Sequence, residues 1–278
     1  IMGISCYLSL SKTNFVATRP VIVKMVRRTV LLFLIGLFIN WFHDAVKGDV
    51  LCFSCLRIWG VMQRIALCYL LVSLFALFVR HRYTVPALAL LLAVYTLLLL
   101  LGNGYSEDPE ANILARADRA LFGYDHLYHK SPVDPEGLLG TISGVAHVLL
   151  GFYCGRLIKQ SKTVERKAVS LFVVGSVCVI MGYLLTYGLP LNKRIWSPSY
   201  VLVTCGLASL LQGLIMFVVD FKHEDDRFMM LRGPFFVCKV FGMNALALYV
   251  SSELLAIIFG QWGVSTCIYD LLHAVIHP

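Results

Sequence analysis

The sequence predicts an all-α fold, a polytopic transmembrane helix bundle with about seven full spans and a partial N-terminal span. Of its 278 residues, 59% are apolar and only 14% are charged, whereas soluble domains carry about 25% charged residues. The apolar residues fall in continuous runs of about 20, the length that crosses a bilayer as a helix. The basic residues gather in alternate connections between these runs, which is typical of membrane proteins.

Six runs are long and apolar enough to span a bilayer directly, and none shows the alternation of barrel strands. They are Gly60–Val79, Tyr83–Leu101, Leu138–Leu157, Ala168–Tyr187, Tyr200–Val219 and Phe235–Phe259. A seventh, Val21–Phe42, begins with basic side chains that can reach the headgroups. Ile1–Leu10 resembles the second half of a further span. Because the chain starts inside an apolar run without an initiator Met, we expect it to be a fragment.

The distribution of Lys and Arg predicts the orientation of the bundle. Sixteen basic residues fall on one side of the predicted spans and eight on the other, so we expect the richer side to be cytoplasmic. This places residues 102–137, the longest connection, outside. The net charge of +8 then reflects topology, and we expect the bilayer but no nucleic acid as a partner, with homo-oligomers allowed. The absence of Asn-x-Ser/Thr favours a bacterial inner (plasma) membrane. We expect residues 1–278 to form a single domain.

Polar side chains at membrane depth are costly, so each is a candidate for a functional site. Arg57 and Arg64 are seven residues apart, which is two helical turns, and so share one helix face, with Gln63 beside it. Two interpretations stay open. The arginines are interfacial anchors at a helix start, or they bind an anion or hold a carboxylate at the outer mouth of the bundle.

Helix-start signals precede two of the predicted spans. Asp134 suits an N-cap, Pro135 the first helical position and Glu136 the positive end of the helix dipole. Ser197 and Pro198 have the same arrangement before a later span. Capping does not require a carboxylate at Glu136, for which the arginine pair would be a natural partner.

Other polar residues carry weaker signals. Cys52 and Cys55 form a single CxxC, which could be a disulfide or half of a metal site. His126 and His129 are three apart, but no helix is predicted there and we expect no metal site. His147 lies inside a span, as a hydrogen-bonded core residue or a proton-transfer group. No phosphate-binding loop is present, which argues against an ATP-driven pump.

Four strings, in this order and spacing, resemble the heparan-α-glucosaminide N-acetyltransferase family and its bacterial inner-membrane relatives. They are LRIWGVMQRIALCYL (56–70), DRALFGYDHLY with DPEGLLGTI (118–128 and 134–142), LPLNKRIWSPSYV (189–201) and FGMNALALYV (241–250). The resemblance covers essentially the whole chain. It implies a transmembrane acyltransferase that moves an acetyl group from cytosolic acetyl-CoA to an amino sugar on the outer side of the membrane.

The resemblance also implies roles for particular residues. The predicted catalytic group is Arg57, Gln63, Arg64, Asp134 and Glu136, and the predicted acetyl-CoA-binding group is Asn192, Lys193, Trp196, Asn244 and Arg28. In the family an essential His lies in the outer loop before the span that begins this chain, so we expect the fragment alone to be inactive. A sugar permease and a catalytically inactive membrane fragment stay open as alternatives.

Overall fold

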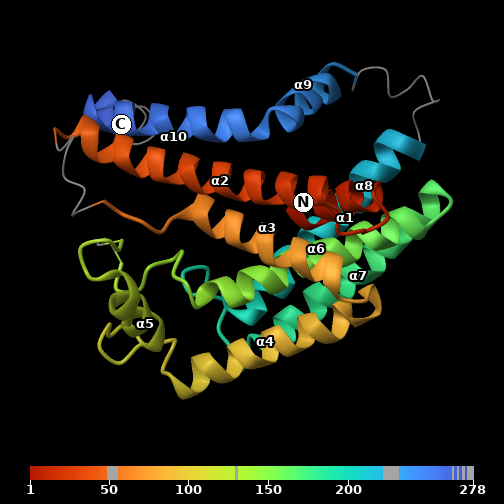
Figure 1. The fold of residues 1–278 in the computed structure, drawn as a ribbon, viewed down its shortest axis with the longest axis horizontal. Helices are drawn as coiled ribbons and strands as arrows, with labels where there is room; N and C mark the ends of the chain where they lie inside the picture. Colours follow the sequence, from red (N-terminus) through yellow and green to blue (C-terminus); the bar gives the residue numbers. More distant parts are fainter. Residues whose placement is uncertain are drawn as a thin grey trace.

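The computed structural model describes residues 1–48, 56–128, 131–221 and 232–264, with residues 266, 267, 269, 270 and 273. These ranges contain helices and no strand (Figure 1). The α-helices are α1 (Met2–Ser11), α2 (Arg19–Val46), α3 (Val61–Phe78), α4 (Thr84–Leu101), α5 (Ile113–Phe122), α6 (Gly140–Gln160), α7 (Val164–Leu185), α8 (Pro198–Met216), α9 (Arg232–Met243) and α10 (Ala245–Gln261). A 3₁₀-helix, η2 (His81–Tyr83), precedes α4, and a π-helical turn, η3 (Phe217–Phe221), follows α8. The all-α class is confirmed.

Within the described ranges, five helical segments are long and apolar enough to cross a membrane. They are Val61–Phe78, His81–Leu101, Gly140–Gln160, Val164–Leu185 and Pro198–Asp220, and the bent pair α9–α10 would make a sixth. The chain is therefore an integral membrane protein with somewhat fewer clear spans than the seven predicted. The difference is α2, which has 28 residues but four basic residues among its first ten, so that its apolar part is shorter than the helix.

The predicted span Phe235–Phe259 is not one continuous helix but the bent pair α9–α10. The helix breaks at Asn244, and the two halves are bent by 81°. Asn244 Nδ2 donates to the carbonyl oxygen of Val240, 3.0 Å away. Polar side chains of this kind compete for helix carbonyls and are found at kinks. After the bend, α10 runs alongside α2 (Figure 1), and Tyr249 and Ile257 pack against its buried apolar face.

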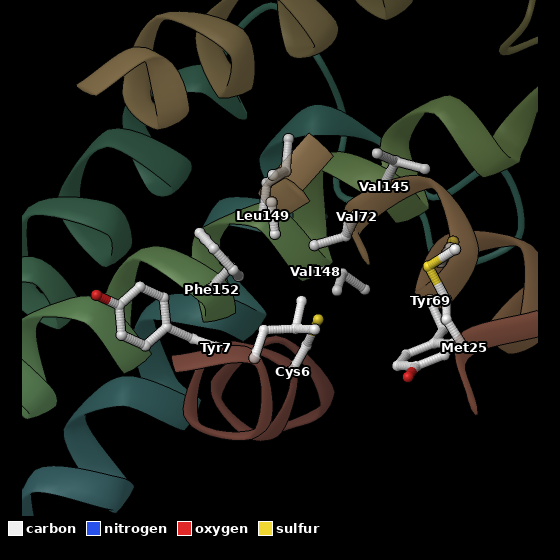
Figure 2. Close-up of a cluster of buried hydrophobic side chains, with 12 residues drawn as sticks. Cys6, Tyr7, Met25, Tyr69, Val72, Val145, Val148, Leu149 and Phe152 are labelled. Carbon is white, nitrogen blue, oxygen red and sulfur yellow. The ribbon is translucent and has the colours of Figure 1, made fainter. Parts of the chain in front are cut away.

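The short helix α1 packs closely against α6. A Cβ atom on Gly3 would lie 2.1 Å from the carbonyl oxygen of Val148, so only glycine allows this approach. Figure 2 shows Cys6 and Tyr7 of α1 facing side chains of α6, among them Phe152. The first predicted half-span is thus a short helix with one face, Gly3, Cys6, Tyr7 and Leu10, buried in the bundle.

One end of the bundle carries the long connection between α4 and α6, and we call it the loop end (Figure 1). The α2 helix ends there, and α3, α6 and α8 begin there. The connection is ordered around α5, whose N-cap Asn112 accepts from Leu114 N at 2.9 Å and donates from Nδ2 to the carbonyls of Gly104 and Ser106. Leu114 packs against buried Tyr95 of α4, so the loop is fixed to the bundle.

Asp118 joins α5 to the segment that leads into α6. The residue is 1% exposed, and its Oδ1 accepts from Leu138 N at 2.9 Å. A Cβ atom on Gly137 would lie 2.1 Å from Oδ2, so the backbone of the two segments is in close contact. Burial raises the pKa of Asp118 to about 6, while the hydrogen bond from Leu138 acts in the opposite direction.

This pKa predicts a pH dependence of stability. Because the folded protein holds the Asp118 proton up to about pH 6 and the unfolded chain releases it near pH 4, the free energy of unfolding falls as pH rises between these values. The carboxyl contributes about 3 kcal/mol to this loss. We expect Asp118→Asn, which keeps the acceptor for Leu138, to flatten the decline of Tm in detergent from pH 4 to 6. Equal slopes for the two proteins would contradict the assignment.

The packing of α1 predicts a second result. We expect Gly3→Ala to lower the stability of the purified protein in detergent by about 1–3 kcal/mol, because the added methyl group meets the backbone of α6. Gly242→Ala is the matched control, since a Cβ atom there meets nothing within 4 Å. Thermal unfolding of both variants makes the comparison. A loss in the control as large as that in Gly3→Ala would show that the close approach is not the cause.

Candidate active site at the loop end

Arg57 bridges two carboxylates from the segment before α6. Its Nη2 lies 2.7 Å from Asp134 Oδ1 and 2.7 Å from Glu136 Oε2. The guanidinium also stacks over the ring of Tyr128, 4.7 Å from the centroid, and Asn40 of α2 donates to the Arg57 carbonyl at 2.8 Å. The side chain is therefore held by Tyr128 and by the two carboxylates, and the backbone of the same residue is held by α2.

The sequence position of Asp134 predicts an N-cap for α6, but Asp134 does not cap this helix. That helix begins at Gly140, with Leu139 as its N-cap. Asp134 instead closes an Asx turn, in which Oδ1 accepts from Glu136 N at 3.0 Å, and Oδ2 accepts from Tyr128 N at 3.1 Å. The carboxylate thus orders the turn that presents both acids to Arg57, and the predicted pairing of Glu136 with the arginines is found at Arg57.

Arg64 is held by the same turn but lies deeper. It is 6% exposed, its Nη1 donates to the carbonyl of Pro135 at 2.8 Å, and its guanidinium lies 4.6 Å from the ring centroid of Trp196. A Cβ atom on Gly140 would lie 2.7 Å from Nη2, so α6 leaves room for the guanidinium only at glycine. Among the described residues, nothing accepts a hydrogen bond from Nε or Nη2.

Trp196 is positioned by the turn that starts α8. Its φ of 54° is in the left-handed region, which is uncommon for a large residue, and Ser143 of α6 donates to its carbonyl at 2.6 Å. Ser197 then caps α8 by accepting from Tyr200 N, as predicted. The ring of His147 lies 5.8 Å from that of Trp196. In the described structure neither His147 Nδ1 nor Trp196 Nε1 has a hydrogen-bond partner.

Gln63 is a further buried polar group. It is fully buried, and neither its amide nitrogen nor its oxygen has a hydrogen-bond partner within the described ranges. A Cβ atom on Gly60 would lie 3.1 Å from Gln63 Oε1 and 3.4 Å from Asn40 Nδ2, so both amides border this glycine. An unpaired buried amide is costly, and such groups mark places where a ligand or water binds.

The other residues of the predicted acetyl-CoA-binding group lie in the turn before α8, at the α9–α10 bend and on α2. Asn192 and Lys193 lie in the turn before Trp196, where Asn192 Oδ1 accepts from Arg194 N and Lys193 is exposed. Asn244 is exposed at the α9–α10 bend. Their predicted roles stay predictions.

Arg28 lies further along the bundle, at 4.7 Å from the ring centroid of Tyr69. Tyr69 follows Arg64 by five residues on α3, which is about 7.5 Å along the helix axis. Arg28 thus contacts α3 about one and a half helical turns from Arg64, toward the end of the bundle opposite to the loop end. Its role too stays a prediction.

Two cavities flank the Arg57–Asp134 ion pair. One of about 260 Å³ lies against α5 and is bordered by Asp118, Asp134 and Tyr128. The other, of about 440 Å³, lies between α2, α10 and the loop and is bordered by Arg57, Tyr128, His43, Asp44 and Glu253 among others. Tyr128 borders both. No local sequence pattern marks Tyr128 as a site residue, although it ends the string DRALFGYDHLY.

The candidate metal ligands of the sequence lie apart from these cavities or outside the described residues. His126 Nδ1 is 2.7 Å from the carbonyl oxygen of Leu56, so this nitrogen has a backbone partner. Cys52, Cys55 and His129 lie outside the described residues.

About half of the chain is similar to two enzymes of known function. No family model matches the chain. Heparan-alpha-glucosaminide N-acetyltransferase of Mus musculus is 30% identical over 166 residues, covering 53% of this chain and 24% of the mouse protein. The enzyme of Homo sapiens is 32% identical over 166 residues, covering 52% of this chain and 23% of the human protein. The chain thus spans about a quarter of the length of the relatives it matches. The motif resemblance is confirmed over about half of the chain, which is similar there to these two heparan-alpha-glucosaminide N-acetyltransferases.

Proposed function

We propose that this chain forms the membrane-embedded part of an N-acetyltransferase, which moves an acetyl group from acetyl-CoA to the amine of an amino sugar at the loop end. The similarity to two N-acetyltransferases supports the reaction class. The observation that carries the assignment to a site is the buried Arg64, whose Nε and Nη2 have no acceptor within the described structure. A buried guanidinium with free donors is costly to the fold, and a bound ligand would offset that cost.

The chemistry requires groups of the kind that gather around Arg64. The ammonium group first loses a proton to water, and the amine nitrogen then forms a bond to the acetyl carbon while negative charge develops on the acetyl oxygen. The carbon–sulfur bond breaks, and the second proton lost by the nitrogen balances the one taken up by the departing thiolate. Donors fixed in a site with little water stabilise such an oxyanion strongly. Arg64, Gln63 and Trp196 supply fixed N–H groups of this kind from α3 and from the turn before α8. Asp134 and Glu136 hold Arg57 at the same turn whose Pro135 carbonyl accepts from Arg64.

The donor side of the proposal rests on the basic residues toward the opposite end. Acetyl-CoA supplies a thioester, and its phosphates require cationic partners. Arg28 of α2 contacts Tyr69 of α3, which follows Arg64 by five residues toward the opposite end of the bundle. Lys24 and Arg27 precede Arg28 on α2. We propose that these residues face the cytoplasm of a bacterial cell and contact the phosphates. The acceptor then binds at the outer, loop end.

Arg64 gives the sharpest mutational test. We expect Arg64→Ala, expressed from the native gene, to lower acetyl transfer from labelled acetyl-CoA to glucosamine in membrane vesicles by at least about 100-fold, the loss typical of removing one oxyanion donor. Arg82→Ala is the control, because Arg82 is exposed beside Tyr83 at the opposite end. Unchanged transfer by the Arg64 variant would exclude this site. Uptake of labelled glucosamine without acetylation by the wild type would instead identify a permease.

A further inference from the structure

We propose that the 440 Å³ cavity between α2, α10 and residues 127–128, which we call the acceptor pocket, binds the ammonium-bearing sugar ring. The inference rests on the proposed function and adds to it a place and a set of ligands for the acceptor. Of the site residues predicted from sequence, only Arg57 borders the acceptor pocket. Its remaining polar side chains are Asn40, His43, Asp44, Lys47, Tyr128 and Glu253.

The size and position of the acceptor pocket suit a small polar ligand. Binding pockets usually measure about 300–1,000 Å³, and this one measures about 440 Å³. It lies at the loop end, where α2 ends at Val46 and α10 ends at Gln261 (Figure 1). A hydrophilic sugar can therefore enter it without crossing the apolar section of the bundle.

The charges of the acceptor pocket favour a cation. Arg57 borders the cavity, but its charge is met by Asp134 and Glu136 at 2.7 Å each. The other charged groups are the carboxylates of Asp44 and Glu253 against the single ammonium of Lys47, with His43 beside Asp44. Two carboxylates on facing helices would bind a primary ammonium by charge-assisted hydrogen bonds. A sugar without the amine would lack this contribution.

The wall of the acceptor pocket is held rigidly. His43 Nδ1 lies 3.0 Å from Asp44 Oδ1 and orients that carboxylate. Asn40 is fixed by its 2.8 Å hydrogen bond to the Arg57 carbonyl, and Tyr128 lies under the Arg57 guanidinium. Preorganised groups bind with less loss of entropy.

The acceptor pocket also leads toward the buried donors. Asn40 borders the acceptor pocket. Asn40 and Gln63 also both lie next to Gly60, because a Cβ atom on Gly60 would be 3.4 Å from Asn40 Nδ2 and 3.1 Å from Gln63 Oε1. Gln63 is followed directly by Arg64 on α3. Neighbouring residues thus connect the acceptor pocket to the buried donors through Asn40, Gly60 and Gln63.

The test measures binding and turnover separately. In purified wild-type protein, we expect calorimetric titration to detect binding of glucosamine, and binding of glucose to be at least tenfold weaker. We expect Glu253→Gln and Asp44→Asn each to weaken glucosamine binding about tenfold. In vesicles they should raise KM for glucosamine by a similar factor, with kcat and KM for acetyl-CoA within twofold of wild type. Glu107→Gln, an exposed acid in the loop outside the acceptor pocket, is the matched control and should change neither.

The outcomes separate the two proposals. Glucosamine binding that depends on Glu253 and Asp44, in a protein that transfers no acetyl group, would support the acceptor pocket and overturn the proposed enzyme. Acetyl transfer with unchanged glucosamine KM in both variants would retain the enzyme and overturn the acceptor pocket. Equal binding of glucose and glucosamine, or no binding of either, would also overturn it.

Discussion

The structure of the loop end depends on one interaction, in which Arg57 and Arg64 bind the turn Asp134-Pro135-Glu136. Arg57 forms ion pairs with both carboxylates of the turn, and Arg64 donates a hydrogen bond to the carbonyl of Pro135 between them. Removing one partner from a buried ion pair leaves an uncompensated charge and costs about 3–5 kcal/mol. The loop and the start of α3 therefore order one another. Asp134 borders one of the two cavities and Arg57 borders the other.

The apolar surroundings explain why these polar groups lie so close together. A guanidinium among transmembrane helices needs several partners, and α6 provides space for Arg64 only because Gly140 and Gly144 lack side chains. Trp196 covers the guanidinium from the turn before α8. Arg64 and Trp196, which are in contact, thus both keep unpaired donors, and Gln63, the residue before Arg64 on α3, keeps an unpaired amide. Unpaired buried donors suit the binding of developing negative charge more than they suit folding stability.

Much of the fold could be predicted from sequence because the bilayer requires long apolar helices. Runs such as Gly60–Val79 differ from α3 by one residue at each end, and the Ser197-Pro198 start of α8 is confirmed. The Asn244 bend could not be predicted, because a single polar residue in an apolar run does not show where its side chain bonds. The helix cap predicted at Asp134 is wrong for a related reason. Its local signal is the same for a cap and for an Asx turn, and only Arg57, 77 residues away, decides between them.

The candidate site was predictable in its residue types but not in its pairing. The seven-residue spacing suggested that Arg57 and Arg64 share a helix face, yet α3 begins only at Val61, so Arg57 lies before the helix and Arg64 in its first turn. His43, Asp44 and Glu253 gave no signal beyond their position near helix ends. They meet because α10 bends back along α2, which is long-range packing that no local pattern reports.

A double-mutant cycle between Arg57 and Asp134 tests the central claim most directly. Thermal unfolding of Arg57→Ala, Asp134→Ala and the double variant in detergent gives the coupling free energy of the pair. For a side chain pair 2.7 Å apart with Asp134 almost fully buried, we predict a coupling of about 2 kcal/mol. Additive effects of the two substitutions, with a coupling near zero, would show that the turn is not held over α3 by this ion pair.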